Sequence, residues 1–345
     1  MESPVASAKA AGDTQGSWAT LDPHSVKQVE HFLAGVCVAY VVVGLVGFFR
    51  NRSIMKSMER SFTSEMESQF DQVGISSGKK GMFLDGLSLC YLYATGRKGL
   101  KFIKIAAELR RRQDMFSVFG EPVFGSGGDR ARVVIPFSGK VEPLIFSVVR
   151  RKDVKKIRNE NLDLEIYTHS APWPTTAPVP KALEILTENS DVVPALLPAS
   201  VQKLIAENEK YIVSIHLTDR GMADPLASKE KSLVAFDFYI PSDSEKVKEL
   251  VYQFSLSYAD RVASLVLTNN GRDAIKQHRK QIEDILAKER EKERQEEAQR
   301  QRIEKKQKEK EDRASKSRDV QRKLEEKEAK RDIKKRNRSL MKVQK

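Results

Sequence analysis

One segment of this chain is apolar over a length that can cross a lipid bilayer. Residues 32–49, FLAGVCVAYVVVGLVGFF, contain no charged side chain over 18 consecutive positions. A membrane-spanning helix needs about 20 predominantly apolar residues, and about 17 suffice at the lower end. Because a buried strand or core helix is rarely apolar over such a length, the segment predicts a membrane anchor. The large apolar side chains of this anchor are Phe32, Leu33, Val36, Val38, Val41, Val42, Val43, Leu45, Val46, Phe48 and Phe49.

A cleaved signal peptide is the main alternative for this segment. The segment is longer than the apolar part of a usual signal peptide, and the 31 residues before it are polar rather than basic. Four basic residues follow it within 15 positions, whereas Lys27 alone precedes it within the same distance. Because positive charge stays on the cytosolic side, we expect a single span with residues 1–31 in the lumen and residues 50–345 in the cytosol. The glycosylation sequons at Asn51 and Asn337 would then be unused.

Most of the positive charge lies in the last part of the chain. Residues 272–345 hold 28 Lys and Arg against 17 Asp and Glu, a net charge of +11, while the whole chain carries +13. The first 271 residues are therefore nearly neutral, with a net charge of +2. Such a local excess predicts a polyanionic partner, either nucleic acid or an acidic membrane surface.

Residues 271–345 are predicted to form a charged helical tail. No proline or glycine occurs after Gly271, and pairs such as Glu304 and Lys308 place an acid four residues before a base, worth about 0.2–0.5 kcal/mol each in an exposed helix. A coiled coil is the rival interpretation, but polar residues fill the later core positions, so at most a partial coiled coil is expected. Ala314–Ser317 is the expected break between two helices.

The last sixteen residues of the tail differ from the rest, because they hold eight bases and only one acid, Asp332. Two interpretations stay open: a solvated basic end that orders only on binding, or a surface that neutralises the phosphates of RNA. The eight bases are Lys330, Arg331, Lys334, Lys335, Arg336, Arg338, Lys342 and Lys345.

Residues 50–120 are predicted to form juxtamembrane amphipathic helices. Met82–Thr95 is apolar but too short for a second span, which favours an interfacial or docked helix. In Arg97–Arg112, charged residues recur at steps of three to four, as on one face of a helix. Such a helix would lie on the anionic cytosolic leaflet or present its basic face to solvent, and both interpretations stay open. The basic residues concerned are Arg97, Lys98, Lys101, Lys104, Arg110, Arg111 and Arg112.

Residues 121–270 predict an α+β domain, because strand and helix patterns interleave without a regular βαβ rhythm. Strands are predicted at Ala131–Phe137, Pro143–Val149, Leu162–Thr168, Tyr211–Thr218 and Ser232–Ile240, of which the last two alternate most clearly. Helices are predicted at Lys152–Glu160, Pro180–Asn189, Ser200–Lys210 and Ser242–Leu267.

The sequence holds no recognisable motif for catalysis or metal binding. The five histidines lack metal-ligand spacing, and we expect a structural role for His216 within a strand. The glycine-rich residues 125–130, GSGGDR, lack the lysine of a phosphate-binding loop. Cys37 and Cys90 are too few for a disulfide framework or a zinc site. A non-enzymatic protein without cofactor, metal or small-molecule substrate is expected.

The order of several segments resembles one protein family over roughly residues 30–345. These segments are YATGRKGLKFIKIAAELRRRQDMFSVF (93–119), ALEILTENSDVVPALL (182–197), YIVSIHLTDR (211–220), SLVAFDFYIP (232–241) and the tail ending in MKVQK. They are similar to the calumin family, the coiled-coil-containing subunit of the PAT complex (protein associated with the endoplasmic reticulum translocon). None of them is a chemical motif, so the resemblance lies in their order.

This resemblance implies a scaffold subunit of an endoplasmic reticulum chaperone complex that aids the biogenesis of multipass membrane proteins. Its implied partners are the small membrane protein Asterix, the Sec translocon, ribosomal RNA, nascent transmembrane segments and the lipid bilayer. Animal members carry a long acidic luminal segment associated with calcium, whereas residues 1–31 hold only four acids, too few for calcium storage. A membrane tether whose charged helix binds a protein or cytoskeletal partner stays open as the alternative.

Overall fold

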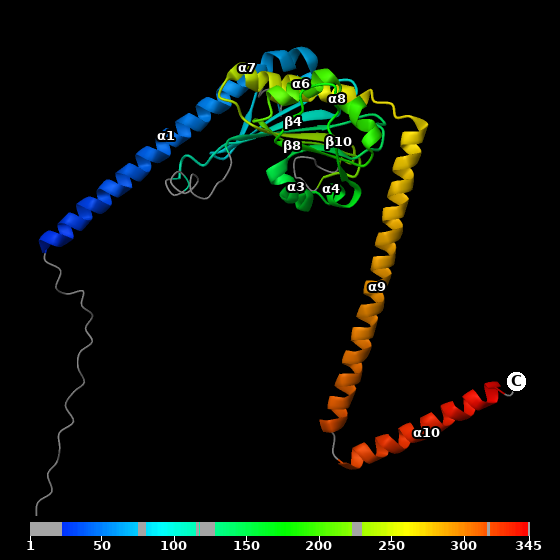
Figure 1. Cartoon of the computed structure of the whole chain (residues 1–345). Helices are drawn as coiled ribbons and strands as arrows, with labels where there is room; N and C mark the ends of the chain where they lie inside the picture. Colours follow the sequence, from blue (N-terminus) through cyan, green and yellow to red (C-terminus); the bar gives the residue numbers. More distant parts are fainter. Residues whose placement is uncertain are drawn as a thin grey trace, which may run out of the picture. The chain divides into compact units, whose positions relative to one another are not determined.

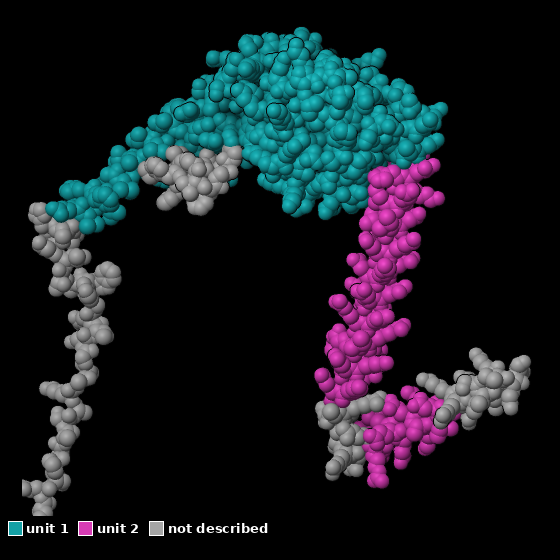
Figure 2. Space-filling view, in the orientation of Figure 1, with its two compact units in different colours: residues 1–275 teal, residues 276–345 magenta. Residues whose placement is uncertain are grey.

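A computed structural model describes residues 23–74, 81–114, 117, 128–222, 230–315 and 318–343 (Figure 1). The chain divides into two compact units, Met1–Ile275 and Lys276–Lys345, which Figure 2 colours teal and magenta. The first unit combines a long helix with a mixed helix and sheet domain, and the second unit is helical.

The first unit begins with α1, one continuous helix over Pro23–Gln69 that contains the predicted anchor. The C-terminal half of α1 packs on the domain through Met55, Met58, Phe62 and Met66, which are buried and recur every three to four residues. The Phe62 ring stacks on Tyr252 with 5.9 Å between ring centroids. Figure 1 shows that the C-terminal half of α1 lies on the domain, whereas its N-terminal half projects away from it. The apolar side chains are therefore buried in the first of these halves and mostly exposed in the second.

The domain is built on a ten-stranded sheet in which each paired strand runs antiparallel to its neighbour. The strands are β1 Gln72–Val73, β2 Phe83–Asp85, β3 Leu89–Thr95, β4 Phe102–Glu108, β5 Arg130–Pro136, β6 Phe146–Arg150, β7 His169–Ala171, β8 Leu183–Thr187, β9 Ile212–Thr218 and β10 Leu233–Tyr239. Their order is β1-β3-β4-β5-β10-β9-β6-β8-β7, with β2 added to β3. The central strand β9 is buried along its whole length.

Short helices cover the sheet on both faces. They are η1 Arg151–Asp153, α3 Val154–Glu160, α4 Leu162–Tyr167, η2 Ser190–Val192, α5 Val193–Leu196, α6 Ala199–Glu207, α7 Ser244–Val247, the π-helical η3 Lys248–Phe254, and α8 Ser255–Ala263. Figure 1 shows α6, α7 and α8 over one face of the sheet, and α3 and α4 beneath the other. An aromatic cluster fills the core under α8, where the Phe236 ring lies 6.0 Å from that of Phe254 and 5.8 Å from that of Tyr258.

Predictions made from periodicity are confirmed for the strands β5, β6, β9 and β10 and for the helices α3, α6 and α7 to α8. Four other segments were predicted wrongly: Met82–Thr95 forms the hairpin of β2 and β3, Arg97–Arg112 contains strand β4, Leu162–Thr168 contains helix α4, and Pro180–Asn189 contains strand β8. In the described part of residues 50–120, the end of α1 and four strands thus replace the amphipathic helices, and the sheet begins at Gln72.

Tertiary contacts explain these differences. In β4, Ile103, Ile105 and Ala107 are buried. The strand pairs with β3 on one edge and with β5 on the other, so its backbone hydrogen bonds are satisfied on both sides. The spacing of charged residues along the chain carries no information about this pairing. In α4, Leu164 and Tyr167 are the buried residues, three positions apart as on one helix face. The strand β8 lacks alternation because both of its faces are covered.

The second unit consists of two helices. It begins within α9, which spans Asn269–Ser315, and ends with α10 over Arg318–Val343. The predicted break at Ala314–Ser317 lies partly outside the described residues, because the structure describes α9 up to Ser315 and α10 from Arg318. Ile285 and Ile303 of α9 are exposed, so the described tail does not bury them in a seam. The partial coiled coil stays a prediction.

Candidate functional site

The N-terminal half of α1 is an exposed apolar surface. Among the described residues, α1 is the one helix long and apolar enough to cross a membrane, with a mean hydropathy of 2.5 in its most apolar window. Nine of the eleven predicted anchor side chains are exposed, and Val43 and Phe48 are partly buried. An apolar surface of this size on a single helix needs a lipid or protein environment.

The anchor meets the domain at Gly47, which is buried. A Cβ at this position would lie 2.1 Å from the main-chain carbonyl oxygen of Arg112, in the loop that follows β4. Real Cβ atoms do not approach an oxygen so closely, so only glycine allows this backbone contact. The last turn of the predicted anchor is therefore in direct contact with the domain.

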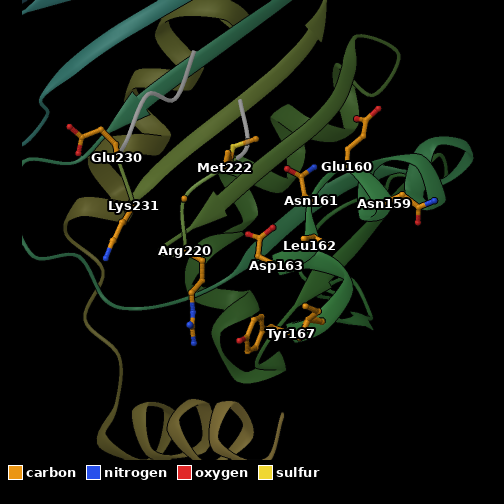
Figure 3. A pocket seen from close by; sticks show the side chains of 12 residues that line it. Asn159, Glu160, Asn161, Leu162, Asp163, Tyr167, Arg220, Met222, Glu230 and Lys231 are labelled. Atoms are coloured by element: carbon orange, nitrogen blue, oxygen red, sulfur yellow. The ribbon is translucent and has the colours of Figure 1, made fainter. Parts of the chain in front are cut away.

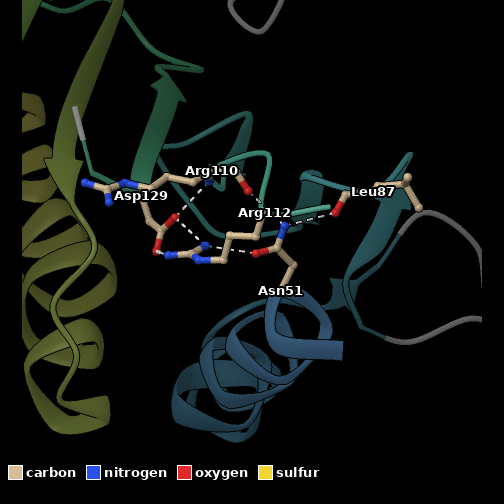
Figure 4. Close-up of polar contacts among 5 residues, drawn as sticks. All are labelled: Asn51, Leu87, Arg110, Arg112 and Asp129. Atoms are coloured by element: carbon tan, nitrogen blue, oxygen red, sulfur yellow. Dashed lines mark hydrogen bonds and ion pairs between the residues drawn. The ribbon is translucent and has the colours of Figure 1, made fainter. Parts of the chain in front are cut away.

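Asn51, one turn further along α1, is fully buried and hydrogen-bonded on both sides of its amide (Figure 4). Its Nδ2 donates to the carbonyl oxygens of Leu87, at 3.2 Å, and Arg110, at 3.0 Å. Its Oδ1 accepts from Nη1 of Arg112 at 2.8 Å. A buried amide with these partners joins α1 to the β2–β3 hairpin and to the end of β4.

Asp129 completes this polar junction. Its carboxylate accepts from both Nη atoms of Arg112, at 2.9 Å and 2.7 Å, and from the main-chain N–H of Arg110 at 2.9 Å. Such a two-pronged pair between guanidinium and carboxylate is short and directional. We call Gly47, Asn51, Arg112 and Asp129 the anchor junction; it holds the exposed half of α1 in one orientation on the domain.

The tip of the β2–β3 hairpin is a second exposed apolar surface. Phe83, Leu84 and Leu87 are 51%, 39% and 49% exposed, respectively. The hydrogen bond from Asn51 to Leu87 places this tip beside α1, two residues beyond Phe49 and thus about 3 Å further along the helix axis. The hairpin tip therefore lies at the level where the apolar part of α1 ends.

The seven bases predicted for a membrane-surface helix lie on β4 and its flanking loops, and at least five of them, including Arg110, have interactions within the described structure. Arg97 pairs with Asp260 at 2.5 Å and Lys101 with Glu230 at 2.5 Å. Lys104 lies over the Tyr91 ring, and Arg112 belongs to the anchor junction. Because this segment contains strand β4, these bases do not share one face of a helix. Lys98, Arg110 and Arg111 are exposed, and their contact with a membrane stays a prediction.

The eight bases predicted to contact RNA lie at the end of the second unit. Lys330, Arg331 and Lys334 are exposed on α10. Lys335, Arg336, Arg338 and Lys342 belong to the same helix, but their side chains lie outside the described part of the chain, as does the whole of Lys345. RNA contact by these residues stays a prediction.

A cavity of about 710 Å³ lies beside α4, lined by ionisable residues that include Asp163, Arg220 and Lys231 (Figure 3). Asp163 accepts from Nε2 of His216 at 2.9 Å, and the two side chains are only 8% and 3% exposed. Burial raises the pKa of Asp163, but hydrogen bonds from His216 and Thr218 outweigh it, so the pKa lies below its usual value.

This pair supports the structural role expected for His216. Its other ring nitrogen is buried and has no hydrogen-bond partner in the described structure, so no hydroxyl or thiol is bonded there for activation. In the same described residues, no group of three His, Cys, Asp or Glu side chains is placed to hold a metal ion. Sequence reasoning missed Asp163, because its segment was taken for a strand.

Comparison with known proteins accounts for this arrangement of anchor, domain and tail. The sequence model of the family described as PAT complex subunit CCDC47 matches residues 28–335. The chain belongs to the CCDC47 family. The match confirms the resemblance deduced from the order of segments, and it includes the anchor junction, the whole sheet and α9.

Two curated CCDC47 relatives are distant in sequence. The chain is 24% identical over 285 residues to the PAT complex subunit CCDC47 of Danio rerio and 23% identical over 285 residues to that of Pongo abelii. Each comparison covers 75% of this chain and 58% of the relative. The chain thus spans less than two thirds of the length of these CCDC47 proteins.

Proposed function

We propose that this chain is a non-enzymatic scaffold subunit of an endoplasmic reticulum chaperone complex that aids the biogenesis of multipass membrane proteins. Membership in a family of PAT complex subunits supports its assembly into such a complex. Residues 32–49 cross the membrane once, with the N-terminus in the lumen and the C-terminus in the cytosol. Asterix, the Sec translocon, the ribosome and nascent transmembrane segments are the proposed partners.

The observation that carries this proposal is the continuity of α1 through the anchor junction. A tether could hold a domain near a membrane with a flexible linker. Here one helix runs from the apolar segment into the core, and Gly47 and Asn51 attach it to the domain at its point of entry. A scaffold needs this property, because its surfaces must lie at a set height above the bilayer.

Two apolar surfaces support a role in the membrane plane. The exposed half of α1 offers a helix face on which a small membrane partner or a nascent segment can pack. The hairpin tip of Phe83, Leu84 and Leu87 lies beside it and enters the interfacial layer of the bilayer. Moving the apolar surface of this tip from water into the bilayer is favourable by about 25 cal/mol per Å² of surface buried.

The basic end of the tail supports binding to ribosomal RNA, the abundant polyanion at a translating membrane. Its eight bases in sixteen residues suit phosphate contacts, which carry little base specificity and weaken steeply with salt. The alternative function is a membrane tether whose charged helix binds a protein or cytoskeletal partner. Ribosome association that is lost with salt distinguishes the two.

The experiment uses the full chain in sealed microsomes. Glutamine replaces the eight bases of residues 330–345, and a control variant carries glutamine at eight bases of α9: Arg290, Lys292, Arg294, Arg300, Arg302, Lys305, Lys306 and Lys308. We expect the terminal variant alone to lose ribosome co-sedimentation, and the wild-type association to weaken between about 50 and 200 mM salt. Equal co-sedimentation of all three chains would contradict ribosome contact through the eight terminal bases.

Topology and assembly are tested in the same microsomes. External protease should remove the C-terminal tail, since that part faces the cytosol. Purification in mild detergent should recover small hydrophobic proteins together with translocon subunits. A tail that is protected from protease would reverse the proposed orientation and exclude contact with ribosomes.

A further inference from the structure

A second cavity, of about 890 Å³, lies between α1 and α7 on a side of α1 that carries basic residues. Phe49, the last residue of the predicted anchor, forms one end of its lining. Arg52, Lys56 and Arg60 extend along the same face of α1, because they are spaced by four residues. Its volume is in the range of small-ligand sites, which measure about 300–1,000 Å³.

The charges of this cavity are poorly compensated. Arg52, Lys56 and Arg60 form no ion pair with the part of the chain that the structure describes. Lys248 adds a fourth cation from η3 and pairs with Glu65 at 3.5 Å, outside the lining. Glu245 is the one acid among the lining residues. Within the described structure, the cavity therefore has three cations without an ion-pair partner, which an anion would neutralise.

Hydroxyl groups line the cavity between these cations. Five serines contribute to its wall, and the Oγ atoms of Ser61 on α1 and Ser244 on α7 lie 2.6 Å apart. This contact bridges the two helices at the wall of the cavity. Cations interleaved with hydroxyl donors are the groups that bind phosphate oxygens.

The distance of each cation from the end of the apolar segment indicates which phosphate groups it can reach. With a rise of about 1.5 Å per residue, Arg52, Lys56 and Arg60 lie about 4.5, 10 and 16 Å beyond Phe49. The headgroup layer on each side of a bilayer is only about 5–7 Å thick. Arg52 thus reaches the phosphates of ordinary lipids, while Lys56 and Arg60 lie above them.

We propose that this cavity binds the headgroup of a phosphorylated inositol lipid, whose additional phosphate projects beyond the plane of the lipid phosphates. The proposal rests on the membrane span proposed for residues 32–49. Phe49 contacts the start of the acyl chains, Arg52 binds the diester phosphate, and Lys56 and Arg60 bind the phosphomonoester. An acidic peptide would use the cations but would have no need of the apolar end of the cavity.

The test uses the full chain in nanodiscs of phosphatidylcholine, titrated with short-chain phosphatidylinositol 4-phosphate. The cavity variant is R52Q/K56Q/R60Q, and the control K140Q/K152Q/K155Q removes the same charge from exposed lysines outside the lining. We expect saturable binding that weakens about tenfold or more in the cavity variant, equivalent to about 1.4 kcal/mol per factor of ten. The control should bind within about twofold of wild type.

Three results would overturn the inference. One is equal weakening in both variants, which indicates a general charge effect. Another is equal binding of short-chain phosphatidylserine, which lacks the projecting phosphate. The third is binding of free inositol 1,4-bisphosphate as tight as that of the lipid, which identifies a soluble phosphate ligand. Any of them leaves the proposed scaffold role intact if ribosome association and membrane retention persist in the same preparations.

Discussion

Gly47 and Arg112 make a backbone contact that no residue with a side chain could reproduce. A Cβ at Gly47 would lie 2.1 Å from the carbonyl oxygen of Arg112, whereas a Cβ at Gly35, three turns earlier on α1, meets nothing within 4 Å. The same helix thus carries one glycine required by packing and one that is not. The contact at Gly47 marks the boundary between the exposed N-terminal half of α1 and the C-terminal half that packs on the domain.

Replacing Gly47 with alanine should loosen the anchor junction. The new methyl group displaces α1 or the loop at Arg112, and overpacking of this kind costs about 1–3 kcal/mol. Urea unfolding of the full chain in neutral detergent measures the loss, and Gly35→Ala is the matched control, since it adds the same methyl group in open space. Equal stability of the two variants would show that the close approach is not required.

Replacing Asn51 with alanine should lower the unfolding free energy of the domain by more than the loss of side-chain volume explains. The carbonyl oxygens of Leu87 and Arg110 would lose their donor, and each unsatisfied buried group costs about 1–3 kcal/mol. Ser53→Ala is the control, because it removes the glycosylation sequon but leaves the amide in place. If Ser53→Ala produced the same loss of unfolding free energy, a glycan rather than the buried amide would be responsible.

The hairpin tip should lie in the bilayer interface of the intact chain. A tryptophan at Leu84 should be quenched by brominated lipids in nanodiscs, because the tip lies beside the end of the anchor. Leu162→Trp is the control, since Leu162 is also an exposed leucine but starts α4, in another part of the domain. Identical quenching at the two positions would remove the hairpin from the membrane-facing surface.

The buried pair of Asp163 and His216 should make the unfolding free energy depend on pH in the acidic range. The folded-state pKa of Asp163 lies below the ordinary value of 3.8, so its ionised form stabilises the fold above that pH, and this contribution is lost as pH falls toward the folded-state pKa. Wild type should therefore exceed Asp163→Asn in unfolding free energy near neutral pH, and the difference should shrink below pH 3.8. A difference that stays constant with pH would mean that the carboxylate charge does not stabilise the fold.

The elements predicted correctly are those whose pattern is local and strong. The apolar run of α1 and the alternation of β9 and β10 are visible within windows of 7 to 18 residues. Where the prediction failed, at β4, α4 and β8, the deciding contacts come from distant strands or from cover on both faces. Periodicity reports the alternation of polar and apolar residue types. It therefore finds β9, where Ser214, His216 and Thr218 alternate with apolar residues although the strand is buried, and it fails at β4, where charged residues pair within the domain.

The anchor junction illustrates the same limit. The sequence identified the anchor residues but gave no reason to connect Asn51 with Arg112, which lies 61 positions away. One signal was available: Gly47 lies in the last turn of an apolar helix, where a small residue allows another backbone to approach closely. Without the fold, nothing in the sequence could name the backbone that approaches.

By itself, the sequence determined that this protein has an apolar segment long enough to span a membrane, a folded domain and a basic helical tail, and the order of its segments identified the family. These properties follow from composition and spacing along a continuous stretch, where neighbouring residues suffice. Only the tertiary structure decided that the anchor helix is built into the domain, and that a hairpin tip and a basic cavity lie at its point of entry. Such relationships depend on close packing between residues far apart in the chain, and that packing is set by the free energy of the whole fold.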